Sequence, residues 1–372
     1  MKKIVPILFL FSGIFYTTTY ILFSIIFFIL LIIKEKNIIL NKKILFCFFL
    51  CFIGIIYPLT IGLIYGDNNL SREYIAKYLI INFIHIYISL YIYSRLDFQY
   101  KRTSIYYLSF GLFINSIASV FFTISIGYTS GYGNVYNPFA GEFINSPAVS
   151  MNLIIPTIIF TYLITNVEVN YITRLLSFVF LILSIFGAFY LGGRTYFIVI
   201  MIIAIKMLFS MKIKNFFMVF YYGLLLFFSF TLLYENLNEY EFFKTIFNRL
   251  GSGIHSTRFD HYIDGIIKLY NNPFGGYSVD HEIEKVKWFH NTIIDLSRFG
   301  GWPTALALII LLLHPVLNNF FKNSLASHLL ISCFLLFMTD VIIEANHIII
   351  LTFLMSFLYS ENIIKSQKHS LK

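Results

Sequence analysis

The sequence predicts an all-α integral membrane protein with about twelve transmembrane helices. Of its 372 residues, 58% are hydrophobic and only 12% are charged, whereas a soluble domain has roughly 45–50% and about 25%. The mean hydropathy is +0.79, and apolar runs of near-spanning length recur along the chain. Such a chain cannot bury its apolar surface in one water-soluble globule, so we expect the lipid bilayer to be its solvent.

The apolar runs define the predicted helices. The first run, 4–33, is long for one helix and is softened by threonines at 17–19, so we expect two short helices there. The further runs are 44–65, 74–93, 104–128, 149–166, 175–191, 195–210, 216–234, 291–316, 325–339 and 347–360. No internal repeat or separate soluble domain is evident, so residues 1–372 form one predicted membrane domain.

The distribution of basic residues predicts the orientation. With a cytoplasmic N-terminus and alternating sides, most of the basic residues fall at inner helix ends, among them Lys2, Lys3, Arg102, Lys212 and Lys365. Short cytoplasmic loops carry such an excess in membrane proteins. Both termini are therefore predicted inside. The formal charge of +9 follows from this arrangement, and no nucleic-acid partner is expected.

Two outer segments are long enough to carry function. Segment 129–148 is rich in Gly, Tyr, Asn and Pro, which predicts an ordered, turn-rich loop or a re-entrant element. Segment 234–290 lies between predicted helices nine and ten and holds four of the nine histidines. Loops of this length are usually functional.

An amphipathic helix is predicted at 256–271 in the longer segment, with Ser256 as its N-cap. One apolar face at helical spacing contains Phe259, Tyr262, Ile263, Ile266, Ile267 and Tyr270. This helix is expected on the membrane surface or against the bundle, with Arg258, His261 and Asp264 on its other side.

Two arginines are candidate anion ligands. Arg194 follows Gly192 and Gly193 at the head of a predicted helix, where the helix dipole and a guanidinium both favour a diphosphate. Arg258 follows a Gly-Ser-Gly sequence that could form an anion-binding nest. The alternatives are an interfacial arginine that orients its helix and a solvated surface arginine.

His290 closes the long loop where the tenth helix begins. Asn291, Asp295, Arg298 and Trp302 follow at helical spacing, which predicts a polar stripe facing the bundle. Histidine can take a proton from an attacking hydroxyl at neutral pH, so His290 is a candidate general base. A structural histidine and an orienting Asp295–Arg298 ion pair are the alternatives.

Metal binding is not expected. Asp340, Glu344 and His347 follow one another at short spacing near an outer helix end, but this set is not a specific metal signature. Cys47, Cys51 and Cys333 lie in apolar runs and are predicted to be packing residues.

Three segments, in order, resemble the superfamily of O-antigen polymerases and O-antigen ligases. They are Gly192-Gly193-Arg194, the stretch from Arg258 through Asn-Pro-Phe-Gly-Gly at 272–276, and His-Asn-Thr-Ile-Ile-Asp at 290–295 with Gly300-Gly301. The motifs cover roughly 192–301, whereas the first half is similar only in helix count. The His-Asn pair that ends the long loop is the most specific match.

The resemblance implies an inverting glycosyltransferase in the bacterial inner membrane, with its active site facing the periplasm. Its donor would be an undecaprenyl-diphosphate-linked oligosaccharide, with no cofactor and no metal. Arg194 and Arg258 would bind the diphosphate, and His290 would orient or deprotonate the acceptor hydroxyl. The further expected substrate-binding residues are His261, Asn291, Asp295 and Arg298.

Within that superfamily, the compact loop and the variable sequence favour an O-antigen polymerase, acting with a chain-length regulator protein as a possible partner. A ligase, which transfers the finished glycan to the lipid A core, is the main alternative, and the glycan could also be a capsule. A flippase for the same lipid-linked units is a third candidate, but it predicts repeats and mid-membrane charges that this sequence lacks.

Overall fold

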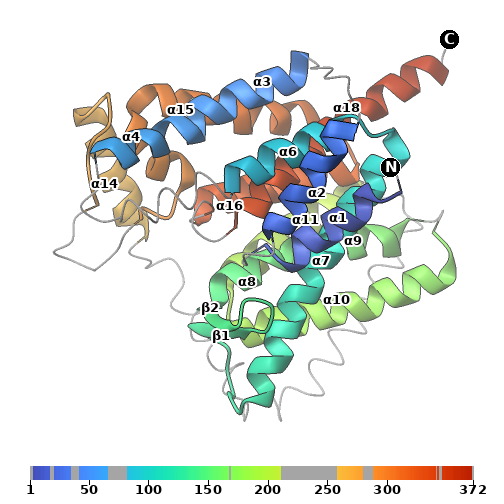
Figure 1. The fold of residues 1–372 in the computed structure, drawn as a ribbon. Helices are drawn as coiled ribbons and strands as arrows, with labels where there is room; N and C mark the ends of the chain where they lie inside the picture. Colours follow the sequence, from blue (N-terminus) through green and yellow to red (C-terminus); the bar gives the residue numbers. More distant parts are fainter. Residues whose placement is uncertain are drawn as a thin grey trace.

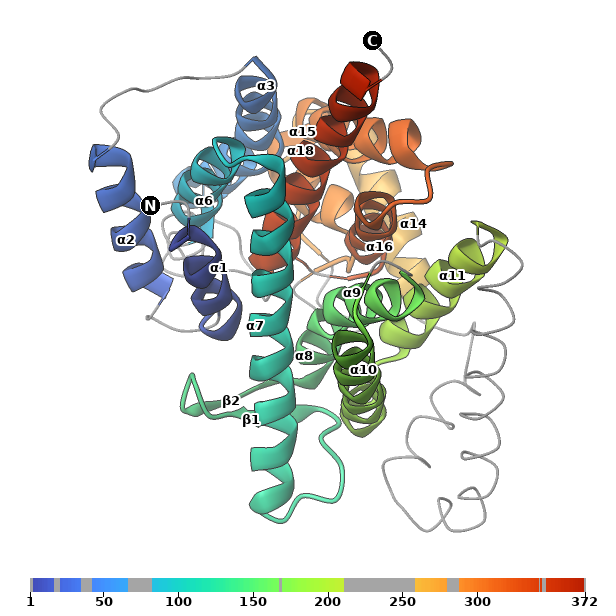
Figure 2. The ribbon, with the colours of Figure 1, turned by 90° about the vertical axis from the view of Figure 1, so that its right-hand side faces the viewer.

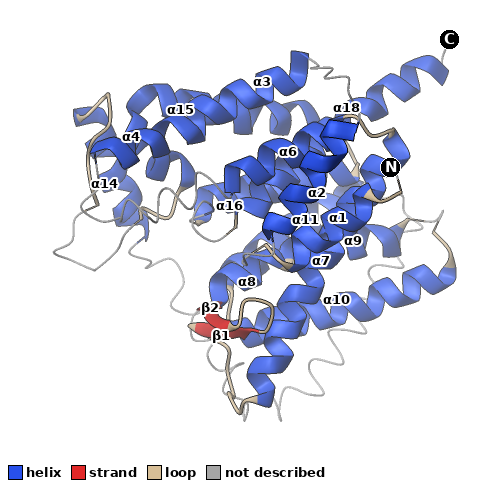
Figure 3. Cartoon of the chain, viewed as in Figure 1, coloured by secondary structure: helices blue, strands red, loops and turns tan. Residues whose placement is uncertain are grey.

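The computed structural model describes residues 3–16, 21–34, 42–65, 82–166, 169–210, 258–279, 288–340, 342 and 346–370. These residues form a bundle of α-helices with one small β-hairpin (Figure 3). Both chain ends lie toward the right-hand side of Figure 1, whereas α14 lies at the left-hand end and the hairpin β1–β2 lies in the lower middle.

The described residues of the first half of the chain form seven helical segments in this order: α1 (Val5–Ile14), α2 (Ile21–Lys34), α3 (Lys42–Cys51), the π-helical turn η1 (Phe52–Ile56), α4 (Tyr57–Tyr65), α6 (Ile84–Ser94) and α7 (Phe98–Ser125). The expected division of run 4–33 into two short helices is confirmed by α1 and α2. Of the run predicted at 74–93, the part before residue 82 lies outside the described residues.

After the strands β1 (Asn134–Asn137) and β2 (Glu142–Asn145) come α8 (Ser146–Asn152), α9 (Ile154–Thr165), α10 (Tyr171–Leu191), α11 (Arg194–Ser210), α14 (Arg258–Asn271), α15 (Thr292–Asn319), α16 (Leu325–Thr339) and α18 (His347–Ser370). The helix predicted at 216–234 and the long segment up to residue 257 lie outside the described residues.

The described helices have the length and composition of membrane spans. Within the described residues, five are long and apolar enough to cross a bilayer: Ile44–Ile64, Phe98–Ser125, Ser146–Thr165, Tyr171–Leu191 and Thr292–Asn319. Shorter apolar helices lie at Val5–Ile14, Ser24–Ile33, Leu325–Thr339 and His347–Ser360. The fold is that of a helical membrane protein. The total of twelve spans and the cytoplasmic location of both termini stay predictions.

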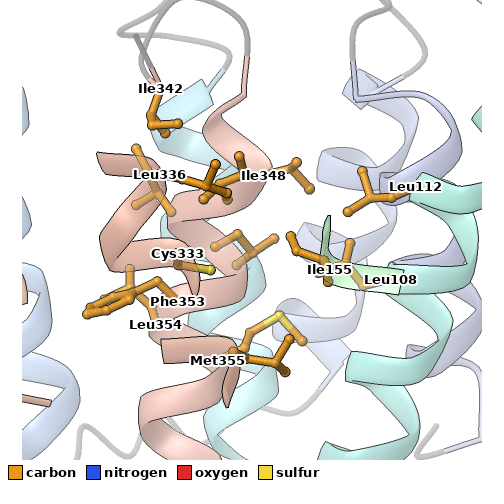
Figure 4. Packing of buried hydrophobic residues seen from close by; sticks show 14 of the residues in the cluster. Leu108, Leu112, Ile155, Cys333, Leu336, Ile342, Ile348, Phe353, Leu354 and Met355 are labelled. Atoms are coloured by element: carbon orange, nitrogen blue, oxygen red, sulfur yellow. The ribbon is translucent and has the colours of Figure 1, made fainter. Parts of the chain in front are cut away.

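The core is built on α8, α9, α16 and α18. The span Ser146–Thr165 is about 72% buried, whereas the span Tyr171–Leu191 is only about 22% buried. Helix α10 therefore lies at the periphery, along the lower right edge of Figure 1, and Figure 2 shows it nearly end-on. Figure 4 shows α16 and α18 packing toward α7 and α9 through Cys333, Leu354 and Leu108. All three cysteines are free and buried, as expected for packing residues.

The turn-rich segment 129–148 is ordered, as predicted, and forms the antiparallel hairpin β1–β2. Two side chains of α7 bind strand β1 of the hairpin. The Tyr136 amide donates to Thr123 Oγ1 at 2.9 Å, and Asn137 Nδ2 donates to Asn115 Oδ1 at 3.2 Å. The hairpin is therefore fixed to the end of a spanning helix.

Helices α1 and α7 pack backbone to backbone at Gly13 and Gly111. A Cβ atom on Gly111 would overlap the Leu10 carbonyl, and one on Gly13 would overlap the Leu108 carbonyl. Small residues at such crossings permit the close contact that drives helix association in lipid.

Gly111→Leu is expected to separate α1 from α7 and to destabilise the protein by about 1–3 kcal/mol, the usual cost of overpacking. Thermal unfolding in detergent would measure the loss. Phe122→Leu, on the exposed side of α7, is the matched control, and equal melting temperatures for the two variants would contradict the close packing.

Candidate functional site

The start of α15 is tied to the end of α16 by Asn291 and Thr292. Asn291 caps α15, because its Oδ1 accepts the amides of Ile293 and Ile294 at 3.0 and 3.3 Å. Its Nδ2 donates to the Met338 carbonyl at 3.3 Å, and Thr292 Oγ1 donates to the Asp340 carbonyl at 3.4 Å. The Asn291 side chain, predicted to bind substrate, thus has a structural role in capping and in joining two helices.

The Asp295 carboxylate holds the chain on both sides of His290. It is fully buried, and its Oδ1 accepts the Phe289 amide at 2.6 Å while its Oδ2 accepts the Asn291 amide at 3.1 Å. His290 itself has a φ of 60°, which is unusual for a residue with a side chain. The hydroxyl of Tyr262 on α14 donates to the His290 carbonyl at 3.1 Å. This backbone conformation is therefore fixed from three directions.

The His290 imidazole lies beside the carboxylate of Asp340, at the end of α16. Its Nδ1 is 3.8 Å from Asp340 Oδ1, and the two side chains are 29% and 11% exposed. The sequence suggested Asp340 only as a weak metal ligand and gave no link between these residues, which lie next to the ends of different helices, α15 and α16. An acid at the end of an apolar helix was the available signal, since ionisable groups at membrane depth are rarely without a role.

Arg298 follows Asp295 on α15 and is fully buried. Its guanidinium carbon is 4.7 Å from the ring centre of Trp288 and 4.5 Å from that of Phe299, and the guanidinium interacts electrostatically with Asp295. Two aromatic rings and a carboxylate stabilise the charge away from water. The prediction that Asp295 and Arg298 face the bundle is confirmed.

Trp302 departs from the predicted polar stripe, because it is 41% exposed. The reason is a break in α15 at Gly301, whose φ of 65° and ψ of −153° are not helical. The break changes the direction and rotation of the helix, so the spacing rule that joins 291, 295 and 298 does not extend to 302.

The turn at 272–276 packs into this break. The amides of Gly276 and Tyr277 donate to the Arg298 carbonyl at 2.6 and 3.3 Å, and the Trp302 amide donates to the Pro273 carbonyl at 2.9 Å. The two glycine motifs of the sequence, 272–276 and 300–301, are therefore complementary halves of one contact. The contact satisfies backbone groups that the break leaves without helical partners.

Gly301→Ala should destabilise the protein strongly. The backbone conformation alone costs roughly 1–3 kcal/mol for a residue with a Cβ atom, and this Cβ would also overlap the Pro273 carbonyl. Gly276→Ala is the matched control, since Gly276 has a φ of 86° but open space around it. In detergent, the melting temperature of Gly301→Ala should be well below that of Gly276→Ala. The reverse order would contradict the docking of the 272–276 turn against the break at Gly301.

Tyr277 adds a neutral hydroxyl next to this cluster. Its ring is buried, and its centre is 6.2 Å from that of Phe289. Burial raises the pKa of the Tyr277 phenol, an effect that the charge of Arg298 opposes. The phenol therefore stays protonated over the physiological range.

Arg194 is half-buried at the first position of α11. It lies where α10 ends and α11 begins, whereas His290 lies before α15. Gly192 ends α10 in the left-handed conformation, with a φ of 66°. Gly193 lies so close to α8 that a Cβ atom would overlap Ser150 Oγ. The two glycines thus make the tight turn that fixes the start of α11, and they are explained by packing.

Helix α14 confirms the predicted amphipathic helix, with Arg258 as its first residue. The Arg258 side chain and the proposed cap Ser256 lie outside the described residues. His261 is half-buried and precedes Tyr262, whose hydroxyl reaches His290. The structure thus brings His290, Asn291, Asp295 and Arg298 together with Asp340, and we call these five residues the candidate site.

His347, considered with Asp340 and Glu344 as a metal ligand, belongs to a buried polar cluster. Its ring packs edge-on against His85 at 5.6 Å, and His85 Nε2 is 3.1 Å from Ser12 Oγ. Asn346, which precedes His347, accepts a hydrogen bond at its Oδ1 from Asn152 Nδ2 at 3.0 Å. Glu344 lies outside the described residues, which contain no group of three His, Cys, Asp or Glu able to hold a metal.

Comparison with known proteins gives no independent assignment. No protein-family model matches the chain, and no curated protein matches its sequence. The geometry of the candidate site and the order of the sequence motifs are therefore the grounds for a functional proposal.

Proposed function

We propose that this protein is a metal-independent glycosyltransferase that joins polyprenyl-diphosphate-linked oligosaccharides, acting as an O-antigen polymerase on the periplasmic face of the bacterial inner membrane. The observation that carries the proposal is His290, a partly exposed imidazole in a constrained backbone conformation beside Asp340. Strained residues persist where surrounding contacts hold them, and they cluster at functional sites.

In the proposed reaction, a hydroxyl of the acceptor glycan attacks the anomeric carbon of the donor. A bond forms between that oxygen and carbon as the bond from the carbon to the diphosphate oxygen breaks. His290 takes the hydroxyl proton, and the Asp340 carboxylate stabilises the imidazolium that forms. The polyprenyl diphosphate leaves with the electron pair.

The leaving group gathers negative charge as its bond to the sugar breaks. Arg194 and Arg258 are the proposed ligands of that diphosphate, since fixed cations there stabilise the transition state more than the ground state. Asp295, which accepts the amides of Phe289 and Asn291, is proposed to position His290. Arg298 is proposed to act through Asp295, with which it interacts electrostatically.

The proposal is tested by deleting the gene and separating the surface polysaccharide on a gel. A polymerase predicts a single repeat unit on the lipid A core and loss of the long chains. Core alone, with long chains still lipid-linked, would replace the proposal with a ligase. A failure to expose any repeat unit outside the membrane would replace it with a flippase.

A further inference from the structure

Helix α14 has three distinct faces. The buried face packs on α15 through Gly265, where a Cβ atom would overlap Ile294, and through Leu269. On the polar face, Lys268 Nζ lies 3.1 Å from Asp264 Oδ2 and 3.1 Å from the Ser278 carbonyl. The apolar face is 53–77% exposed and contains Phe259, Ile263, Ile266, Ile267 and Tyr270.

The exposed apolar face continues onto a membrane-spanning helix. Phe274 follows α14 in the turn that bonds to the Trp302 amide, and it is 86% exposed. On α15, Trp302, Leu306 and Ile310 are 41%, 53% and 49% exposed and share one helix face by their spacing. An exposed apolar stripe on a spanning helix faces lipid, so the surface of α14 adjoins a lipid-facing surface.

The depth of α14 follows from the break in α15. After Gly301, the helix continues from 302 to 319, about 27 Å at 1.5 Å per residue, which is close to the ~30 Å hydrocarbon thickness. Trp302 therefore lies near one boundary, where tryptophan is enriched. Helix α14 packs on the part of α15 before the break, at the left-hand end of the bundle in Figure 1.

We propose that α14 is an interfacial helix whose apolar face inserts into the boundary between phospholipid headgroups and acyl chains. The occupant of this face is lipid, because the face is continuous with the lipid-facing stripe of α15. The inference goes beyond the proposed glycosyl transfer and does not depend on it. Lipid would thus anchor α14, the helix whose Tyr262 hydroxyl donates to the His290 carbonyl.

Tryptophan fluorescence with brominated lipids tests the depth. In a Trp302→Phe background the remaining tryptophan, Trp288, is 4% exposed and gives a constant signal. Ile266→Trp and Tyr270→Trp place the probe on the apolar face, and Asn271→Trp places it on the exposed polar side of the same helix end. The full chain is reconstituted in phosphatidylcholine vesicles with bromines either near the headgroup or near the chain ends.

Ile266→Trp and Tyr270→Trp are expected to be quenched to a similar extent, and roughly twofold more by bromines near the headgroup than by those near the chain ends. Asn271→Trp should be quenched much less. No bromine quenching at 266 and 270 would overturn the proposal: strong acrylamide quenching would then indicate water, and weak acrylamide quenching a protein partner. Stronger quenching near the chain ends would also overturn it, because α14 would then cross into the bilayer.

Discussion

Replacing His290 with glycine is expected to abolish extension of the surface glycan while leaving the fold intact. General acid–base groups typically contribute 10²–10⁴-fold to a rate, so a loss of roughly that size is expected for the turnover of lipid-linked repeat units. Glycine suits this position because the φ of His290 is 60°, a conformation that glycine adopts without strain. The chemistry is therefore removed without a cost in stability.

The control for this experiment is His314→Ala. His314 is an exposed histidine in the second part of α15, near Asn318, and its loss should leave chain length unchanged. The measurement is the length distribution of the surface polysaccharide, with melting temperature in detergent as the check on folding. Full-length chains from a stable His290→Gly protein would remove the general-base assignment.

Asp295→Ala is expected to produce the largest loss of stability in the candidate site. The substitution leaves the amides of Phe289 and Asn291 without their acceptor and removes the carboxylate that interacts electrostatically with the buried guanidinium of Arg298. Removing a buried charge that interacts with a buried charge of opposite sign typically costs about 3–5 kcal/mol. Poor expression and a large drop in melting temperature in detergent are the expected results.

The matched control is Asp260→Ala, which removes an exposed carboxylate from α14 and should change stability by no more than about 0.5 kcal/mol. Asp295→Asn keeps an oxygen acceptor but removes the charge, so its melting temperature should lie between those of Asp295→Ala and Asp260→Ala. Equal melting temperatures for the Asp295→Ala and Asp260→Ala proteins would show that the Asp295 carboxylate does not hold the His290 backbone.

Local patterns predicted the helices well. The run expected at 325–339 coincides with α16, and run 4–33 contains two helices, α1 and α2, as expected. Apolar runs and their ends depend on neighbouring residues, which a sequence displays directly. The strands β1 and β2 were read only as an ordered loop, because four-residue strands held by a spanning helix have little local signal.

The candidate site was predicted only in part, because its key contacts join distant segments. His290, Asp295 and Arg298 lie close together in the chain, so helical spacing identified them. The pairing of His290 with Asp340 depends on the packing of α15 beside α16. Likewise, the capping role of Asn291 and the docking of the 272–276 turn appear only once the backbone is known.

The break at Gly301 divides α15 into two parts whose side chains do not follow one continuous helical spacing. In an unbroken helix each residue turns the next by about 100°, so one inserted residue in the membrane part would rotate Asp295 and Arg298 relative to their neighbours. Here the polar part of α15 is held by the 272–276 turn and by α16, and the apolar part begins afresh at Trp302. The membrane-spanning part can therefore change in length or register while the candidate site keeps its orientation.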